Sequence, residues 1–285
     1  MDKKKADKIL TIVLWVLIVA NAVPLLWYGT RVFVTDRFVI KGESMEPTLH
    51  TGEGVWVNKL LMGARIYTKF IFDGPDLHCF RMPGLRKLRV GDVAVFNYPY
   101  GRGGDTIAFK INYVYCKRCW GTPGDTVRIV DGRLETETAE TVARHPSHGS
   151  NLFSGFAQRM QQTPDSVLLR MRMLRAGQFA GERDNWTTKD FGPIVVPRKG
   201  MTIALDSINR KHYERVIRWE TGVTVGEFAH SNSPKYTFQQ NWYFFVGDNV
   251  TNSRDSRFFG FVPADFVIGI VPKGKRSRLI SFCST

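Results

Sequence analysis

Cysteine is scarce in this chain, whose 285 residues include four, at positions 79, 116, 119 and 283. Four cysteines do not make a disulfide framework for a chain of this length, so the fold must depend on its apolar core; 43% of the residues are hydrophobic. Cys116 and Cys119 have the spacing of a redox or zinc pair. If they lie on a strand, however, positions i and i+3 point to opposite faces roughly 10 Å apart, which excludes a bridge.

Histidine is also scarce, with six residues. No Cys/His pair has the spacing that would complete a zinc site with the two central cysteines, and His145 and His148 lie in a polar, loop-like stretch. We therefore expect neither a metal nor a cofactor.

Acidic residues are fewer than basic ones, 26 against 40, and the formal net charge is +14. This excess suggests an acidic partner, either nucleic acid or an anionic lipid surface. The chain has no nucleic-acid-binding motif and no basic stripe along a periodic helix, which argues against nucleic acid. The basic residues are scattered, as on an ordinary solvated surface.

Long apolar runs are absent except for one, residues 9–28, which three residues alone interrupt. Twenty residues are enough to span a bilayer as a helix. Lysines precede the run in residues 1–8, and Trp27 and Tyr28 close it, as at a membrane interface. We expect the N-terminus in the cytoplasm and the remaining chain outside it. The tail 273–285 is too short and too basic to be a second span.

A removable signal peptide is the main rival, because Ala20-Asn-Ala22 is an acceptable small-x-small cleavage site. The apolar run continues past Ala22 to Tyr28, however, so the full run matches a membrane span better than a short signal core. Pro24 would also hinder binding of this site as an extended substrate. We expect the anchor to be retained.

The rest of the chain reads as mainly β. We expect strands at 31–41, 52–58, 90–98, 107–115, 236–247 and 261–272, with an edge strand at 191–197. Residues 207–222 have helical spacing, a cap at Asp206 or Ser207, and Gly222 as a stop. Residues 135–149 read as loop, and 158–175 as either strand or helix.

Three short elements carry the chemistry. Residues 42–49 read Gly-Glu-Ser-Met-Glu-Pro-Thr-Leu, so that Ser44 follows a strand and precedes a proline that bars a regular helix. Residues 115–125 read Tyr-Cys-Lys-Arg-Cys-Trp-Gly-Thr-Pro-Gly-Asp and contain Lys117. Residues 247–263 read Gly-Asp-Asn-Val-Thr-Asn-Ser-Arg-Asp-Ser-Arg-Phe-Phe-Gly-Phe-Val-Pro. In this order the SMxPT, KRxxGxPGD and GDNxxNSxDSRxxGxVP elements resemble the type I signal peptidases, which are membrane-bound Ser/Lys proteases.

A serine becomes a nucleophile only when a base takes its proton, and no histidine here is suited to that. A lysine with an ordinary pKa of about 10.4 is protonated at neutral pH, so Lys117 must be desolvated to serve as the base. On a strand, Tyr115 and Cys119 share its face and add no anion. Ser44 and Lys117 stand 73 residues apart and can meet only through tertiary structure.

The resemblance implies further roles. Ser253 would hydrogen-bond the Lys117 amine, and Asp255 and Arg257 would form an ion pair that shapes the adjacent loop. Substrate contacts are implied for five residues: Phe38, Ile40, Met45, Tyr115 and Cys116. The positions matching Phe38 and Ile40 line shallow pockets for small side chains, although both are equally suited to an ordinary core.

Three departures from the family pattern stand out. Gly42 stands where some members have a serine whose hydroxyl completes the oxyanion hole. Here the hole would rest chiefly on backbone N–H groups, and the Ser44 N–H is the donor that we name. Lys41 replaces a frequent proline. Val250-Thr251 replaces the usual Arg-Asp, two charges that we expect to support structure more than chemistry.

The resemblance implies a fold with one N-terminal membrane helix followed by an antiparallel β catalytic domain, interrupted by an inserted, largely β subdomain. We expect a cytoplasmic N-terminus (1–8), an anchor (9–28), a catalytic core in two parts (31–130 and 236–272), an insert (131–235) and a basic tail (273–285).

The expected function is removal of signal peptides from exported proteins after small-x-small sequences, by a monomer in the bacterial plasma membrane. Two alternatives stay open: a dedicated maturation peptidase of a secretion or conjugation system, and a non-catalytic membrane-anchored assembly factor. A self-cleaving Ser/Lys repressor is excluded by the membrane segment and by the lack of a DNA-binding helix pair.

Overall fold

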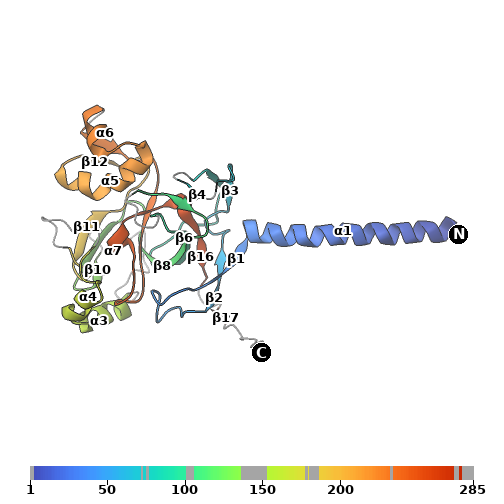
Figure 1. Ribbon diagram of the computed structural model, residues 1–285, viewed down its shortest axis with the longest axis horizontal. Coiled ribbons are helices and arrows are strands. Elements are labelled where there is room, and N and C mark those ends of the chain that lie inside the picture. The colour runs from blue at the N-terminus through green and yellow to red at the C-terminus, as the bar shows by residue number, and fades with distance from the viewer. Residues whose placement is uncertain are drawn as a thin grey trace.

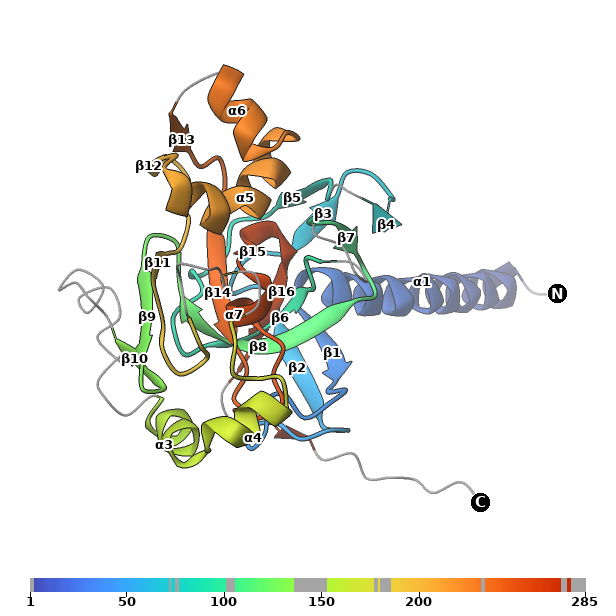
Figure 2. The same ribbon diagram turned by 60° about the vertical axis from the view of Figure 1, so that its left-hand side comes forward.

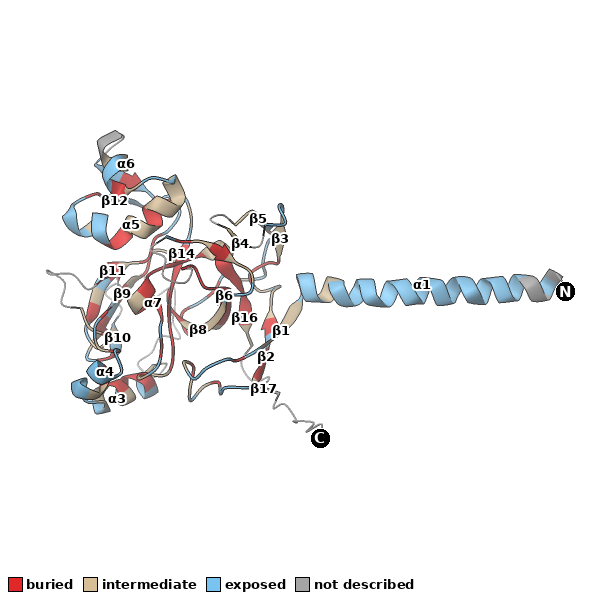
Figure 3. Ribbon diagram, viewed as in Figure 1, coloured by how far each residue is buried: buried red, intermediate tan, exposed pale blue. Residues whose placement is uncertain are grey.

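The computed structural model describes residues 3–71, 73–74, 77–100, 106–135, 153–176, 179, 186–231, 234–272 and 276–277. A single long helix, α1 (Lys3–Phe33), projects away from a β-rich domain that holds the rest of the described chain (Figure 1). Within the stretch Asp7–Phe33, the most apolar window of 18 residues has a mean hydropathy of 2.6, and none of that window is buried. Figure 3 shows the helix in the colour of exposed residues over most of its length, with a half-buried part near the domain. By length and composition this helix is suited to span a membrane.

The helix is longer than the apolar run, because local contacts extend it beyond Tyr28. Thr30 Oγ1 donates to the Trp27 carbonyl at 2.7 Å, and the Arg31 guanidinium lies 5.1 Å from the centroid of the Trp27 ring. The connection between α1 and the β-rich domain is short and is held by side-chain contacts. Arg31 pairs with Asp36 at 2.7 Å, and Lys59 Nζ donates to the Arg31 carbonyl at 2.6 Å. The expected strand at 31–41 therefore begins at residue 35 instead.

The main sheet has eight strands, and every pairing within it is antiparallel. Its order is β1-β2-β16-β6-β8-β14-β15, and β17 also pairs with β2. The strands are β1 (Thr35–Val39), β2 (Gly54–Asn58), β6 (Val93–Asn97), β8 (Val114–Gly121), β14 (Trp242–Val246), β15 (Val262–Pro263), β16 (Val267–Val271) and β17 (Arg276–Ser277). The prediction of a mainly β, antiparallel domain behind one apolar helix is confirmed.

Smaller sheets surround this one (Figure 2). The order β10-β9-β11 joins β9 (Thr126–Val130), β10 (Arg133–Glu135) and β11 (Phe191–Val195). Three two-stranded pairs complete the set: β3 (Arg65–Tyr67) with β5 (Cys79–Arg81), β4 (Asp73–Gly74) with β7 (Phe109–Lys110), and β12 (Thr202–Ala204) with β13 (Lys235–Thr237). As predicted, the 191–197 segment forms an edge strand, and its register shifts between Phe191 and Ile194, around Pro193.

The insert is less β-rich than expected. Its described residues include α3 (Ser154–Gln162), α4 (Asp165–Arg170), α5 (Ser207–Thr221) and α6 (Val225–Ser231). The sequence of residues 158–175 did not decide between strand and helix, and the structure shows them as helical over most of their length. The 207–222 helix is confirmed: Asp206 accepts hydrogen bonds from the backbone N–H groups of Ile208 and Asn209, and Gly222 ends the helix with a φ of 77°.

Three predicted strands are broken. Residues 107–115 divide into β7 and the start of β8, with a turn between them in which the Tyr113 N–H donates to the Lys110 carbonyl. Residues 236–247 divide into β13 and β14, because the backbone N–H groups of Gln239 and Gln240 donate to the Glu220 carboxylate of α5 at 2.8 and 3.0 Å instead of to a strand. Residues 261–272 divide at Pro263, which has no N–H to donate, and a 3₁₀ turn (Ala264–Phe266) leads into β16. The predictions for His145, His148, Cys283 and most of the tail concern residues outside the described ranges.

Candidate active site

Ser44 lies in the loop 41–52 that joins β1 to β2 and folds back toward the centre of the main sheet. Met45 and Leu49 anchor this loop, since both are buried and pack with Ile40 and Val55. The backbone N–H groups of Thr48 and Leu49 both donate to the Met45 carbonyl, which closes a tight turn after the serine. The apolar side chains on either side of Ser44 thus fix a half-exposed hydroxyl at the edge of the core.

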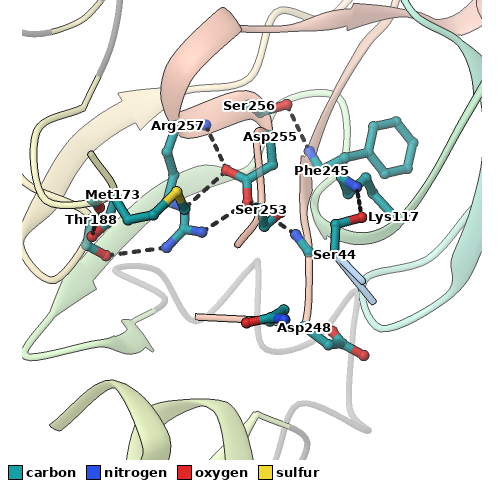
Figure 4. Close-up of polar contacts among 12 residues, drawn as sticks. Ser44, Lys117, Met173, Thr188, Phe245, Asp248, Ser253, Asp255, Ser256 and Arg257 are labelled. Atoms are coloured by element: carbon teal, nitrogen blue, oxygen red, sulfur yellow. Dashed lines mark hydrogen bonds and ion pairs between the residues drawn. The ribbon is translucent and has the colours of Figure 1, made fainter. Parts of the chain in front are cut away.

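Lys117 lies on β8, between β6 and β14. Its neighbour in register on β6 is Ala94, whose small side chain leaves room for the long amine. Lys117 is 3% exposed, and its Nζ lies 5.1 Å from the centroid of the Tyr115 ring. The Nζ is hydrogen-bonded to Ser44 Oγ, as Figure 4 shows. Two residues far apart in the sequence are therefore in direct contact.

Burial lowers the pKa of the Lys117 amine below its ordinary value of 10.5, against the opposing effects of Asp255, Cys116 and Asp248. The neighbours on its strand add little negative charge. Burial raises the pKa of the Cys116 thiol to about 12, and it also raises the pKa of Tyr115. Both side chains are neutral at neutral pH, so loss of the lysine proton is favoured by the surroundings.

The two nearby carboxylates are each matched by an arginine. Asp255 and Arg257 are fully buried and pair in bidentate fashion, Nε to Oδ1 at 2.9 Å and Nη2 to Oδ2 at 2.8 Å. Asp248 pairs with Arg118 in the same way, at 2.8 and 2.5 Å. Each carboxylate is thus offset by a guanidinium, which weakens its hold on the lysine proton.

The ion pair expected between Asp255 and Arg257 is present, and a short helix sets its geometry. Arg257 lies in the first turn of a short helix, α7 (Ser256–Phe259), which Asp255 caps. The resemblance implies a hydrogen bond between Ser253 and the Lys117 amine, but the structure gives the Ser253 hydroxyl a different partner. Ser253 Oγ donates instead to Asp255 Oδ2 at 2.7 Å (Figure 4), because this carboxylate oxygen faces the hydroxyl from two residues away.

The implied substrate-contact residues form two groups. Phe38, Ile40, Met45 and Cys116 pack in one apolar cluster, in which Ile40 and Met45 are buried while Phe38 and Cys116 remain partly exposed. Val39 points away from this cluster and is 47% exposed, as the strand alternation predicts. Tyr115 lies apart from them, on the Lys117 side of β8, within a group of tyrosine rings.

Asn249 connects the serine loop to the loop after β14, and sequence reasoning did not single it out. Its backbone N–H donates to the Ser44 carbonyl at 3.1 Å, and its Nδ2 donates to the Glu43 carbonyl at 3.0 Å. Thr251 donates to Asn249 Oδ1 from both its N–H and its hydroxyl, while Val250 is buried in the core. The pair that replaces Arg-Asp therefore serves a structural purpose here.

Arg118, Asp248 and Thr48 were also missed. Thr48 Oγ1 donates to Asp248 Oδ2 at 2.5 Å, and Arg118 binds the same carboxylate, so the three matched elements meet at this one side chain. All three residues belong to the sequence elements 42–49, 115–125 and 247–263. Their place in these elements, near Ser44, Lys117 or Asn249, was the sequence signal that could have identified them.

The comparisons with known proteins identify the family of this chain. A family model described as signal peptidase, peptidase S26, matches residues 9–272. The chain belongs to this family. It is therefore a serine endopeptidase by membership, and the non-catalytic alternative loses its support.

Several bacterial relatives are similar over most of the chain. Signal peptidase I T of Bacillus subtilis is 31% identical over 240 residues, covering 84% of this chain and 72% of that protein. Signal peptidase I of Buchnera aphidicola subsp. Schizaphis graminum is 25% identical over 247 residues, covering 85% and 68%. A crystal structure of a signal peptidase I from Enterococcus faecalis covers 66% of this chain and all of that one at 21% identity; its TM-score of 0.27 is too low to compare the two folds.

Gly247 is the tightest position of the site. A Cβ there would lie 2.0 Å from Ser253 Oγ and 2.5 Å from the Ser44 carbonyl oxygen. We expect Gly247→Ala to displace the serine loop, to lower the free energy of unfolding by about 1–3 kcal/mol, and to remove most peptidase activity. Gly226→Ala is the matched control, because that Cβ meets nothing closer than 4.0 Å. Wild-type turnover by Gly247→Ala would contradict this close approach.

Proposed function

We propose that this chain is a membrane-bound signal peptidase that removes N-terminal signal peptides from exported proteins after small-x-small sequences, with Ser44 as nucleophile and Lys117 as general base. The observation that carries the proposal is the contact between the buried Lys117 amine and the Ser44 hydroxyl. A neutral amine accepts the hydroxyl proton as Ser44 Oγ attacks the scissile carbonyl carbon.

The same lysine completes the reaction. After accepting the serine proton, Lys117 donates it to the leaving amine as the peptide bond breaks, which leaves an acyl-enzyme on Ser44. Lys117 then accepts a proton from water as the water attacks the ester carbonyl, and it returns this proton to Ser44 Oγ as the ester bond breaks and the signal peptide is released. One side chain takes the role that histidine and aspartate share in other serine proteases.

The oxyanion of the tetrahedral intermediate needs donors. Among the described residues the Ser44 backbone N–H donates to no other group, so we propose that it binds the oxyanion. Gly42, with a φ of 104° and open space around its Cβ position, adds no side-chain donor. The hole would then rest on the backbone of the serine loop.

We propose that Phe38 and Cys116, the partly exposed members of the apolar cluster, contact the small side chains of the substrate, while Ile40 and Met45 support them from below. Tyr115 would border the reacting atoms on the lysine side. Ser253, Asp255 and Arg257 would maintain the loop that faces Ser44 and Lys117. The enzyme acts as a monomer in this proposal.

Removal of either catalytic side chain should abolish cleavage without unfolding the protein. We expect Ser44→Ala and Lys117→Ala each to lower kcat/KM on a generic Ala-x-Ala preprotein by about 10⁴-fold or more, with the double variant no worse than either, because residues that act as a unit are not additive. Appreciable turnover by Lys117→Ala would refute the Ser/Lys mechanism. A wild-type enzyme that ignores generic preproteins would favour the dedicated maturation peptidase.

The rate should rise with pH. Since burial lowers the pKa of Lys117 in the folded enzyme, the neutral, active fraction grows as pH rises through that lowered pKa, at a lower pH than for a solvated lysine. We expect kcat/KM to rise from mildly acid pH and to level off in the alkaline range. A profile whose single limb lies at about 10.5 would show instead that Lys117 is solvated in the free enzyme.

We propose that α1 is a retained anchor with its N-terminus in the cytoplasm and the catalytic domain outside. Intact mass of the membrane-extracted protein should show a chain that keeps residues 1–22; a mature chain starting at Val23 would contradict retention. For orientation, the four native cysteines are first replaced by alanine, because Cys79 and Cys116 are free and partly exposed. A membrane-impermeant maleimide added to cells whose outer membrane or wall has been removed should then label Ser154→Cys, which is exposed, and leave Lys4→Cys unlabelled. The reverse pattern would overturn the orientation.

A further inference from the structure

Helix α3 (Ser154–Gln162) contacts two of the segments that carry the proposed site: the lysine strand β8 and the loop after β14. Both views place it beside β10 at one end of the domain (Figures 1 and 2). The rings of Phe153 and Phe156 lie 4.7 and 4.8 Å from that of Trp120, three residues after Lys117 on β8. The guanidinium of Arg257 lies 5.5 Å from the Phe156 ring centroid. The helix thus packs on both the lysine strand and the buried Asp255–Arg257 pair.

The most informative contact is a single hydrogen bond. Arg159, on the same helix, donates from Nη2 to the Asp248 carbonyl oxygen at 3.0 Å. This carbonyl belongs to the peptide group that joins Asp248 to Asn249, and the N–H of that group donates to the Ser44 carbonyl at 3.1 Å. A peptide group is planar, so a donor that fixes its oxygen also fixes the direction of its N–H. A positive charge at the oxygen also polarises the group and strengthens the N–H as a donor.

The helix is held firmly enough to transmit this constraint. Phe156, Ala157 and Met160 are buried on its inner face. A Cβ on Gly132 would lie 2.6 Å from Met160, which shows how closely α3 packs on the turn between β9 and β10. Gln161 Nε2 adds a hydrogen bond to Asp131 Oδ2 at 2.7 Å.

We propose that α3 braces the catalytic loop and that Arg159 is a positioning residue, which sets the Ser44 backbone through the Asp248–Asn249 peptide. This inference rests on the proposed function of Ser44. It assigns a part in the reaction to the insert, whose residues stand outside the three catalytic motifs.

The kinetic test uses the full-length enzyme in detergent and a preprotein substrate. We expect Arg159→Ala to lower kcat by about tenfold with KM changed less than about twofold, because small misplacements of a nucleophile cost rate rather than binding. Arg159→Lys, which keeps a charged donor, should recover part of kcat. Arg170→Ala is the matched control, since Arg170 is an exposed arginine of the next helix, α4. A kcat for Arg159→Ala equal to that of wild type overturns the inference and leaves the proposed function intact.

A second measurement is independent of activity. Amide hydrogen exchange in the segment 247–257 should be faster in Arg159→Ala than in wild type, most of all at the Asn249 N–H, and unchanged in Arg170→Ala. A fall in kcat with unchanged exchange at Asn249 would mean general damage and would count against the brace. If the wild-type enzyme cleaves no preprotein, the proposed function fails, while faster exchange at Asn249 would still support the brace and unaltered exchange would refute it.

Discussion

The site depends on one electrostatic constraint, that a lysine must be kept away from water without an unpaired anion beside it. Burial alone disfavours the charged amine, but a single free carboxylate nearby would restore the proton. The structure meets the constraint by pairing both neighbouring carboxylates with arginines, Asp255 with Arg257 and Asp248 with Arg118. Two fixed ion pairs near Lys117 therefore favour the neutral amine that the proposed mechanism requires.

These pairs also explain how distant segments of chain are held together. Asp248 binds Arg118 of the lysine strand and Thr48 of the serine loop, while Asp255 accepts from the Gly247 N–H and from Ser253. The charges that tune the amine are therefore the same groups that assemble the site. A change in any one of them alters geometry and proton affinity together, which is why the two effects are hard to separate by mutation.

Local signals made part of this structure predictable. The 207–221 helix carries its own cap at Asp206 and its own stop at Gly222, and the apolar run at 9–28 needs no tertiary partner to be recognised. The motifs predicted the contact between Ser44 and Lys117. Two expectations failed for different reasons. Glu220, about twenty residues away, takes the N–H groups that would have continued one long strand, and the sequence near Gln239 and Gln240 does not identify it. Asp255 is close in sequence, but only the folded loop shows that its carboxylate, and not the Lys117 amine, takes the Ser253 hydroxyl.

The joint between α1 and the domain has a consequence for the choice of scissile bond. Helix and β1 are separated by one residue, and Arg31, Asp36 and Lys59 lock them together. If α1 spans a bilayer in the proposed orientation, this short, rigid connection would hold Ser44 at a fixed height above the lipid. A peptide that rises from the membrane would then be cut at the bond that reaches that height, so distance would select the scissile bond alongside side-chain size.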